Sequence, residues 1–320
     1  MCVKNAKFYP KGELVAIRRA FGDAFSEVAN RNPKVVVVTA DLGGSVNLKE
    51  FWETYPERFF NCGVAEADMI GISAGLALMG FVPFAVTFGS FMGRAMDHVR
   101  QSIGHNKVNV KIVGSHGGVS NAQDGPSAHA LEDIAMMRAI PDMAVVVVTD
   151  SNQVFKAVSA VADYRTSVYL RLYREPLPVF TDEKTPFTIG KANIMRKGTD
   201  VTVVACGPHV GFCLEWAEEL ASEVSMEVID CHTLKPIDTE TLLASAQRTG
   251  AVVTVEDHNI HGGLGSAVAE ILVEHYPTPM KRVGLTNFAT SGKYVDVINA
   301  VGIGKEDLKT AIADVLKRKH

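Results

Sequence analysis

The chain has 320 residues, of which 47% are hydrophobic and 21% are charged, a composition typical of soluble globular proteins. Its formal net charge is -4 at pH 7, and its Lys and Arg residues are scattered, which argues against a nucleic-acid-binding protein. The length exceeds the usual size of one domain, so we expect two domains, each with its own hydrophobic core.

The sequence contains no segment typical of export or membrane insertion. Residues 1–13 carry lysines but no apolar core of signal-peptide length, and no later apolar run reaches about 18 residues. We therefore predict a cytoplasmic protein. The cysteines are odd in number and form no CxxC pair, which argues against disulfides and a zinc site and favours free thiols. They are Cys2, Cys62, Cys206, Cys213 and Cys231.

Short β-branched runs alternate with longer helical patterns along the first half of the chain. This alternation predicts an α/β fold with parallel sheets covered by helices. We predict strands at residues 34–39, 82–88, 108–113, 144–149 and 167–172, and helices at residues 66–78, 91–103, 131–138 and 152–162.

The pattern changes at residues 175–187, where three prolines stand among charged residues, and we interpret this stretch as a linker. We therefore predict two domains, residues 1–180 and 188–320, each a mostly parallel sheet covered by helices. In the second we expect strands at residues 201–205, 226–229, 251–255 and 282–285, and helices at residues 211–222, 239–247, 265–275 and 305–317.

Five residues are candidates for a ligand site, and two of them lie in polar loops after a predicted strand, where α/β sheets bind ligands. Glu66 begins a helix of small residues, Phe88 and Phe91 flank a strand-to-helix turn, and His116 and Asp124 lie in glycine-containing loops. Taken singly, each has a plainer interpretation, such as a carboxylate that complements a helix dipole, a core aromatic or a surface histidine. Their occurrence together makes a ligand site the stronger hypothesis.

Most of the chain resembles the transketolase family. The motifs that resemble its pyrimidine-binding domain are Ala-Asp-Leu-Gly-Gly-Ser (40–45), Gly-Val-Ala-Glu (63–66), Thr-Phe-Gly-Ser-Phe (87–91) and Asp-Gly-Pro-Ser (124–127) with Leu-Glu-Asp (131–133). The remainder resembles the family's carboxyl-terminal domain, through Glu-Asp-His-Asn (256–259) and Gly-Gly-Leu-Gly (262–265).

The resemblance implies that this chain binds the aminopyrimidine end of thiamine diphosphate. Glu66 matches the catalytic carboxylate that hydrogen-bonds ring nitrogen N1′, where it favours the tautomer whose 4′-nitrogen takes the proton from C2 of the thiazolium. Phe91 matches the aromatic that stacks on the pyrimidine, and Phe88 matches a second aromatic of the same pocket. Asp41 matches an acidic residue beside the cofactor.

Four further positions match the family's sugar-phosphate contacts: Arg18, Ser45, His116 and Arg174. Guanidinium groups give forked, charge-assisted hydrogen bonds, so this set suits a terminal dianion. Read alone, the two arginines would be interpreted as surface charges. Asp124 matches a contact to a sugar hydroxyl near the reacting carbons.

The chain departs from the family pattern at two places. Many members have a histidine after Asp-Gly-Pro-Ser or its Thr equivalent, but here that position is Ala128, and His129 follows one place later. In the family that histidine assists proton transfer, and His129, a water or a residue of the partner chain is the candidate substitute; we also count His129 among the substrate-binding residues. The larger departure is that Gly-Asp-Gly followed by Asn, which holds Mg²⁺ and the diphosphate, is missing. We therefore predict no metal ligands here, and an α2β2 heterotetramer with a separate subunit that carries this motif.

The resemblance implies ketol transfer by the carboxyl-terminal subunit of a split transketolase, from an anionic ketose to an aldose. One alternative is a related thiamine enzyme, such as a deoxyxylulose-phosphate synthase or the β subunit of a keto-acid dehydrogenase. Another is a non-catalytic paralogue. The Asp-Gly-Pro-Ser motif with Arg18 and Ser45 favours transketolase, and Glu66 with Phe91 argues against the paralogue. The donor, the acceptor and the choice of phosphate or sulfonate stay open.

Overall fold

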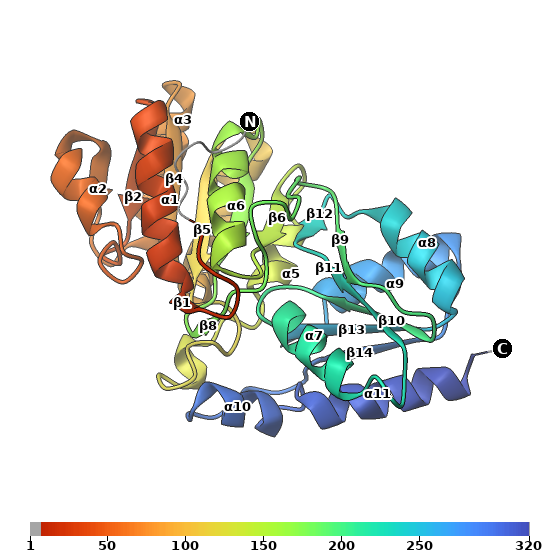
Figure 1. Cartoon of the computed structure of the whole chain (residues 1–320). Helices are drawn as coiled ribbons and strands as arrows, with labels where there is room; N and C mark the ends of the chain where they lie inside the picture. The colour runs from red at the N-terminus through yellow and green to blue at the C-terminus, as the bar shows by residue number, and fades with distance from the viewer. Residues whose placement is uncertain (1–7, 320) are drawn as a thin grey trace.

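The computed structural model describes residues 8–319, so Cys2 lies outside the described residues. The strands form two large sheets, one of seven strands in the order β12-β6-β7-β5-β4-β2-β3 and one of five in the order β14-β13-β10-β11-β9, and one small sheet of two strands (Figure 1). Both large sheets are mostly parallel and covered by helices, so the predicted α/β class is confirmed.

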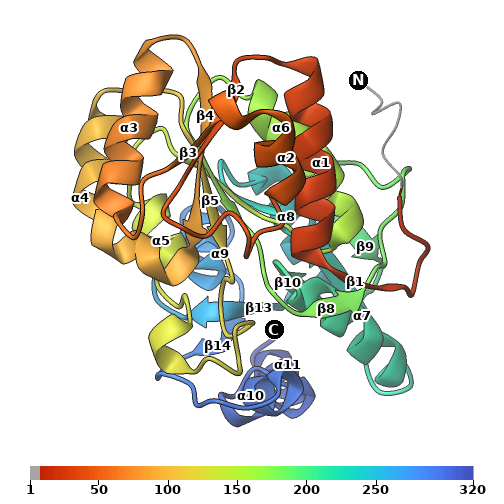
Figure 2. The same ribbon diagram turned by 90° about the vertical axis from the view of Figure 1, so that its left-hand side faces the viewer.

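The larger sheet is covered on both faces. Its parallel strands are β2 (Val35–Thr39), β3 (Phe59–Asn61), β4 (Val82–Phe88), β5 (Lys111–Ser115), β6 (Ala144–Val147) and β7 (Val168–Arg171). Helices α1 (Ile17–Arg31), α2 (Lys49–Thr54) and α6 (Ser151–Asp163) lie on one face, and α3 (Glu66–Leu78), α4 (Met96–His98) and α5 (Asp133–Arg138) lie on the other (Figure 2). Strand β2 is buried on both sides because Val35 and Val37 join one apolar cluster and Val38 joins the other.

The smaller sheet is built in the same way. Its strands are β9 (Asn193–Arg196), β10 (Val201–Ala205), β11 (Met226–Asp230), β13 (Val252–Asn259) and β14 (Met280–Leu285). Helices α8 (Thr239–Thr249) and α9 (Leu264–His275) cover one face, whereas α7 (His209–Glu219), α10 (Tyr294–Ala300) and α11 (Lys305–Lys317) cover the other.

The two halves of the chain are interlocked. Strand β12 (Thr233–Lys235) comes from the second half but pairs antiparallel with β6 at the edge of the larger sheet. The predicted linker includes β8 (Pro176–Pro178), which pairs antiparallel with β1 (Leu14–Ala16). A sequence prediction of two separate units therefore misses these strand pairings. The boundaries 1–180 and 188–320 stay predictions.

One predicted element was wrong in type. Residues 91–103 do not form one α-helix: a 3₁₀ segment (Gly89–Ala95) leads into the single turn α4 and then into a π-helix (Val99–His105). Gly93 weakens an α-helix inside the predicted range. Gly89, at the start of the 3₁₀ segment, is tightly confined, since a Cβ there would lie 3.0 Å from the Cβ of Ala130.

The four cysteines among the described residues are free, as predicted, and all but Cys62 are buried. Between residues 8 and 319, no helix has both the length and the apolar character needed to cross a bilayer.

Candidate active site

The predicted site residues gather at the carboxyl ends of the parallel strands of the larger sheet. Asp41 follows β2, Glu66 follows β3, Phe88 ends β4, His116 follows β5 and Arg174 follows β7. This edge is where α/β sheets bind ligands, and the structure therefore brings together residues that are far apart in sequence.

Glu66 is the first residue of α3 and is only 3% exposed. Its Oε1 accepts no hydrogen bond although it is buried. The guanidinium of Arg94 is the nearby cation, with Nη1 at 3.6 Å from Oε1, but Arg94 is itself 64% exposed. A buried carboxylate oxygen that lacks a donor fits a ligand that brings one, such as a protonated ring nitrogen.

Four planar groups form a continuous row beside Glu66. The rings of His116 and Phe88 are stacked with centroids 3.8 Å apart, and those of Phe88 and Phe91 are stacked at 5.5 Å. The guanidinium of Arg94 lies 5.2 Å from the centroid of Phe91. Both phenylalanines are only half-buried, so they keep ring surface for a flat ligand. Sequence reasoning missed Arg94, whose only signal is its position three residues after Phe91.

His116 is buried, and its surroundings disfavour a positive charge. Burial, followed by the charges of Arg174 and Arg18, lowers the pKa of His116 to about 4, with Asp124 acting in the opposite direction. Its Nδ1 lies 2.9 Å from Ser115 Oγ. The imidazole is therefore neutral at physiological pH, and the two guanidinium groups supply the positive charge of this region.

The loop that follows His116 contains two other predicted residues in contrasting settings. Asp124 is exposed, whereas His129 is 4% exposed and neither of its ring nitrogens has a hydrogen-bond partner among the described residues. Burial lowers the pKa of His129 as well. Arg174 is oriented toward the same loop by a hydrogen bond from Nη1 to Asn121 Oδ1 at 2.9 Å.

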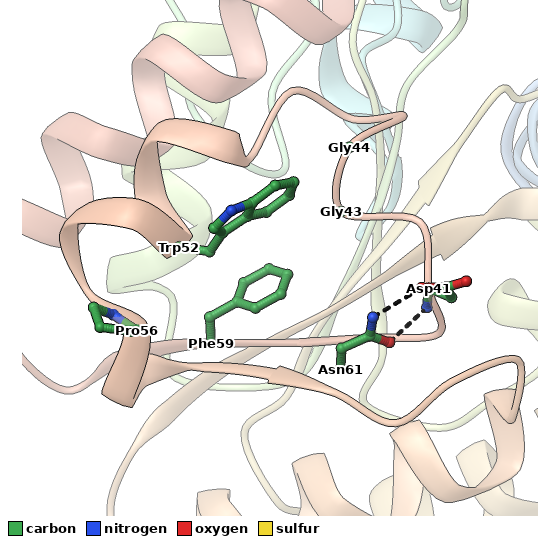
Figure 3. Close-up of a pocket in the computed structure, with 7 residues that line it drawn as sticks. All are labelled: Asp41, Gly43, Gly44, Trp52, Pro56, Phe59 and Asn61. Carbon is green, nitrogen blue, oxygen red and sulfur yellow. Dashed lines mark hydrogen bonds between the residues drawn. The ribbon is translucent and has the colours of Figure 1, made fainter.

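Asp41 and Ser45 lie on the loop between β2 and α2, which borders a cavity of about 340 Å³ (Figure 3). The rings of Trp52 and Phe59 line one side of it, with centroids 5.3 Å apart. Asn61 fixes Asp41, because its Oδ1 accepts from the Asp41 backbone N–H at 3.1 Å and its Nδ2 donates to Asp41 Oδ1 at 2.8 Å. Sequence reasoning missed Asn61, since this pairing requires β2 and β3 to lie side by side.

Within residues 8–319, no group of three or more His, Cys, Asp or Glu side chains is arranged to hold a metal ion. The side chains at this edge of the sheet offer an organic ligand one carboxylate, two aromatic rings, a neutral imidazole and two guanidinium groups.

Two family models match the chain: the transketolase pyrimidine-binding domain at residues 13–179 and the transketolase C-terminal domain at residues 190–308. The chain is 39% identical to the 6-deoxy-6-sulfo-D-fructose transketolase subunit SqwH of Clostridium sp. (strain MSTE9), in an alignment that covers 99% of each chain. It is 36% identical to an apulose-4-phosphate transketolase subunit of Phocaeicola vulgatus, over 95% of this chain and 99% of that one.

Solved structures agree with these similarities. A split gene transketolase, described as an inactive beta4 tetramer, has a TM-score of 0.88 at 41% identity, with 96% of this chain and 100% of that chain covered. Transketolase from Leishmania mexicana has the same fold, with a TM-score of 0.83 at 22% identity over 98% of this chain and 47% of that one. The chain therefore belongs to the transketolase family, as the subunit of a split transketolase that carries the pyrimidine-binding and carboxyl-terminal domains and works with a partner subunit.

Proposed function

We propose that this chain binds the aminopyrimidine of thiamine diphosphate on Glu66, Phe88 and Phe91, with Asp41 beside the cofactor. The observation that carries the proposal is the buried Glu66 Oε1, which has no hydrogen-bond donor and lies beside the aromatic row. When bound, the cofactor supplies the electron sink for breaking a carbon–carbon bond next to a ketone. Glu66 holds the proton at N1′, and Phe91 orients the ring by stacking.

The anionic end of a ketose would bind at Arg18, Ser45, His116 and Arg174. Two arginines around a neutral imidazole favour a terminal anion, because charge-assisted hydrogen bonds to it are stronger than neutral ones. Two relatives support this choice: the name of one specifies a sulfonated fructose, and that of the other specifies a sugar 4-phosphate. Asp124 and His129, farther along the same loop, would contact the sugar near the reacting carbons.

The diphosphate and its Mg²⁺ would be held by a partner chain with the Gly-Asp-Gly motif, in an α2β2 assembly. The relative described as an inactive beta4 tetramer supports the view that such a chain is inactive without its partner. It also supports a contact between copies of this chain. We assign that contact to the outward face of α3, where Gly71, Gly75 and Leu78 are exposed.

Reconstitution tests this function. The purified chain, a candidate partner subunit, and their mixture are each supplied with thiamine diphosphate, Mg²⁺, a phosphorylated or sulfonated ketose and an aldose. We expect ketol transfer in the mixture only. Turnover by the isolated chain would contradict the two-subunit proposal. Cofactor binding by the mixture without ketol transfer would favour a non-catalytic paralogue. In a parallel assay with pyruvate in place of the ketose, release of CO₂ would favour a related thiamine enzyme, such as a deoxyxylulose-phosphate synthase.

A further inference from the structure

All of the predicted site residues lie in the first half of the chain, between Arg18 and Arg174. The five-stranded sheet of the second half supplies none of them. Its strand β13 nevertheless contains Asp257, which is fully buried and whose carboxylate binds a residue of the first half. The contacts of this carboxylate connect the second half of the chain to the site.

Arg171, in β7 of the larger sheet, lies between two buried carboxylates. Its Nε donates to Asp133 Oδ2 at 2.8 Å, and its Nη1 donates to Asp257 Oδ1 at 2.7 Å. Its Nη2 donates to the backbone carbonyls of Ala130 at 3.0 Å and of Asp257 at 3.3 Å. Because the loss of one partner would leave a buried charge uncompensated, the three charged groups hold one another in place.

The carbonyl of Ala130 belongs to the loop that carries the predicted substrate residues. It also accepts the N–H of Gly118 at 3.0 Å, and the carbonyl of Gly118 accepts the N–H of Ala130 at 3.1 Å. His116 precedes Gly118 by two positions, and His129 is next to Ala130. Arg171 is therefore bonded to the backbone pair at the base of the loop, close in sequence to both histidines.

Asp257 also contacts this loop directly. Gly118 has a φ of +63°, and a Cβ added to it would lie 1.9 Å from Asp257 Oδ2. A Cβ at Gly117 would lie 2.6 Å from Arg171 Nε. Only glycine allows the loop to lie this close to the two charged groups. The second half also donates two backbone hydrogen bonds to the segment that includes the loop, from Asn259 N–H to Leu131 O at 3.0 Å and from Gly292 N–H to Ala122 O at 3.1 Å.

We propose that Asp257 is a positioning residue for the reaction: through Arg171 and its contact with Gly118, it fixes the backbone that orients His116 and His129. The inference rests on the proposed role of these two histidines in substrate binding. In this proposal the carboxyl-terminal half contributes to the site indirectly, by holding the loop in place.

The experiment compares Asp257→Asn with Glu270→Gln. The control removes the charge of another ion pair between the two halves, in which Arg138 Nη2 lies 2.7 Å from Glu270 Oε2, without touching the loop. In the isolated full chain, hydrogen exchange at Gly118 and Ala130 should become roughly tenfold faster in Asp257→Asn while the central strands β10 and β11 keep wild-type rates. In the mixture with the partner subunit, kcat/KM should fall roughly 10²-fold, as expected when reacting groups are misplaced. Glu270→Gln should match the wild type in both measurements.

A second variant covers the case in which Asp257→Asn does not fold. Gly118→Ala keeps all three charges but places a methyl group against Asp257, and it should produce the same local exchange and the same loss of kcat/KM. The proposal is overturned if a folded Asp257→Asn, or Gly118→Ala in its place, exchanges and reacts like the wild type, or if exchange rises equally in β10 and β11. The exchange measurement needs neither cofactor nor partner, so it still reports on the loop if the wild-type mixture shows no ketol transfer.

Discussion

At Glu66, a carboxylate is buried at a helix terminus while one of its oxygens accepts no hydrogen bond. Glu66→Gln keeps the size of the side chain and one hydrogen bond but cannot exchange a proton with N1′. We expect C2 deuterium exchange of bound thiamine diphosphate in the assembled complex to slow by about 10² to 10⁴-fold, with a smaller loss of cofactor affinity. NMR at saturating cofactor and partner subunit measures this exchange.

The matched control is Asp68→Asn. Asp68 lies in the same first helical turn and is exposed, so its replacement removes a charge from the same helix end without altering the pocket. If Asp68→Asn slows C2 exchange as much as Glu66→Gln does, the effect is one of helix electrostatics. Wild-type exchange and turnover in Glu66→Gln would leave Glu66 as an ordinary helix-terminal carboxylate.

The residues of this candidate site could be proposed from the sequence, but their contacts could not. Glu66, Phe88 and Phe91 stand in motifs, whereas the stacking of Phe88 on His116 depends on the register of β4 and β5, which pairs Phe88 with Ser115. Arg94 was not predicted because its approach to Glu66 depends on the 3₁₀ segment that replaces the expected helix. Whether these residues bind cofactor and substrate stays a prediction.

At the scale of elements, the sequence predicted α3 and α11 with the bounds that the structure has. It did not predict α1, although Ile17, Phe21 and Phe25 form the buried, helix-spaced pattern that would have indicated it. Strand β12 could not be predicted, because it has three residues and its partner β6 lies far away in sequence. Local patterns indicate helices, but they do not show which distant strands pair.

The contact between α6 and β11 contains a buried carboxylate, Asp230, that should make the stability of the fold depend on pH. Asp230 Oδ2 accepts from Gln153 Nε2 at 2.7 Å, its Oδ1 has no partner, and burial raises the pKa of Asp230 to about 7. Because the pKa of Asp230 is raised in the folded state, the carboxyl group contributes its full stabilisation below its ordinary pKa of 3.8. That stabilisation is lost as the pH rises through about 7. The variant Asp230→Asn does not titrate. The free energy of unfolding of the variant minus that of the wild type should therefore be about 2 kcal/mol larger at pH 8 than at pH 5.

Urea unfolding at the two pH values measures this difference, and Asp150→Asn is its control. Asp150 is a buried carboxylate in the same region, but it accepts hydrogen bonds from the backbone N–H groups of Gln153, Phe180 and Thr181. Replacing Asp150 should destabilise the fold by about 1 to 3 kcal/mol at both pH values and keep most of the pH dependence, because burial is the main cause of the raised pKa of Asp230 and the charge of Asp150 is a smaller one. An Asp230→Asn variant whose stability follows that of the wild type at both pH values would show that Asp230 is not protonated in the folded protein.

At the scale of the whole molecule, one face of α3 has no partner within the described chain. The inward residues Met69, Ile70 and Ala74 are buried, but outward Gly71 and Gly75 would meet nothing within 4 Å if each carried a Cβ. Residues four apart, such as Gly71 and Gly75, lie on the same face of a helix. Each glycine in a helix interior lowers stability by roughly 0.5 to 1 kcal/mol relative to alanine. Two glycines on one exposed face therefore suit the close approach of another backbone. This geometry supports the contact between copies that we propose for the assembled enzyme.

Gly71→Arg tests that contact. Arginine is a better helix former than glycine and has open space at this position, so the isolated chain should fold with at least wild-type stability. In an interface, the same side chain would be a buried, unpaired charge, and association between copies should weaken roughly 10²-fold or more. Light scattering across a concentration series measures the association, and Ala313→Arg, on the exposed side of α11, should leave it unchanged. A Gly71→Arg chain that associates like the wild type would place the contact between copies on a different face of the molecule.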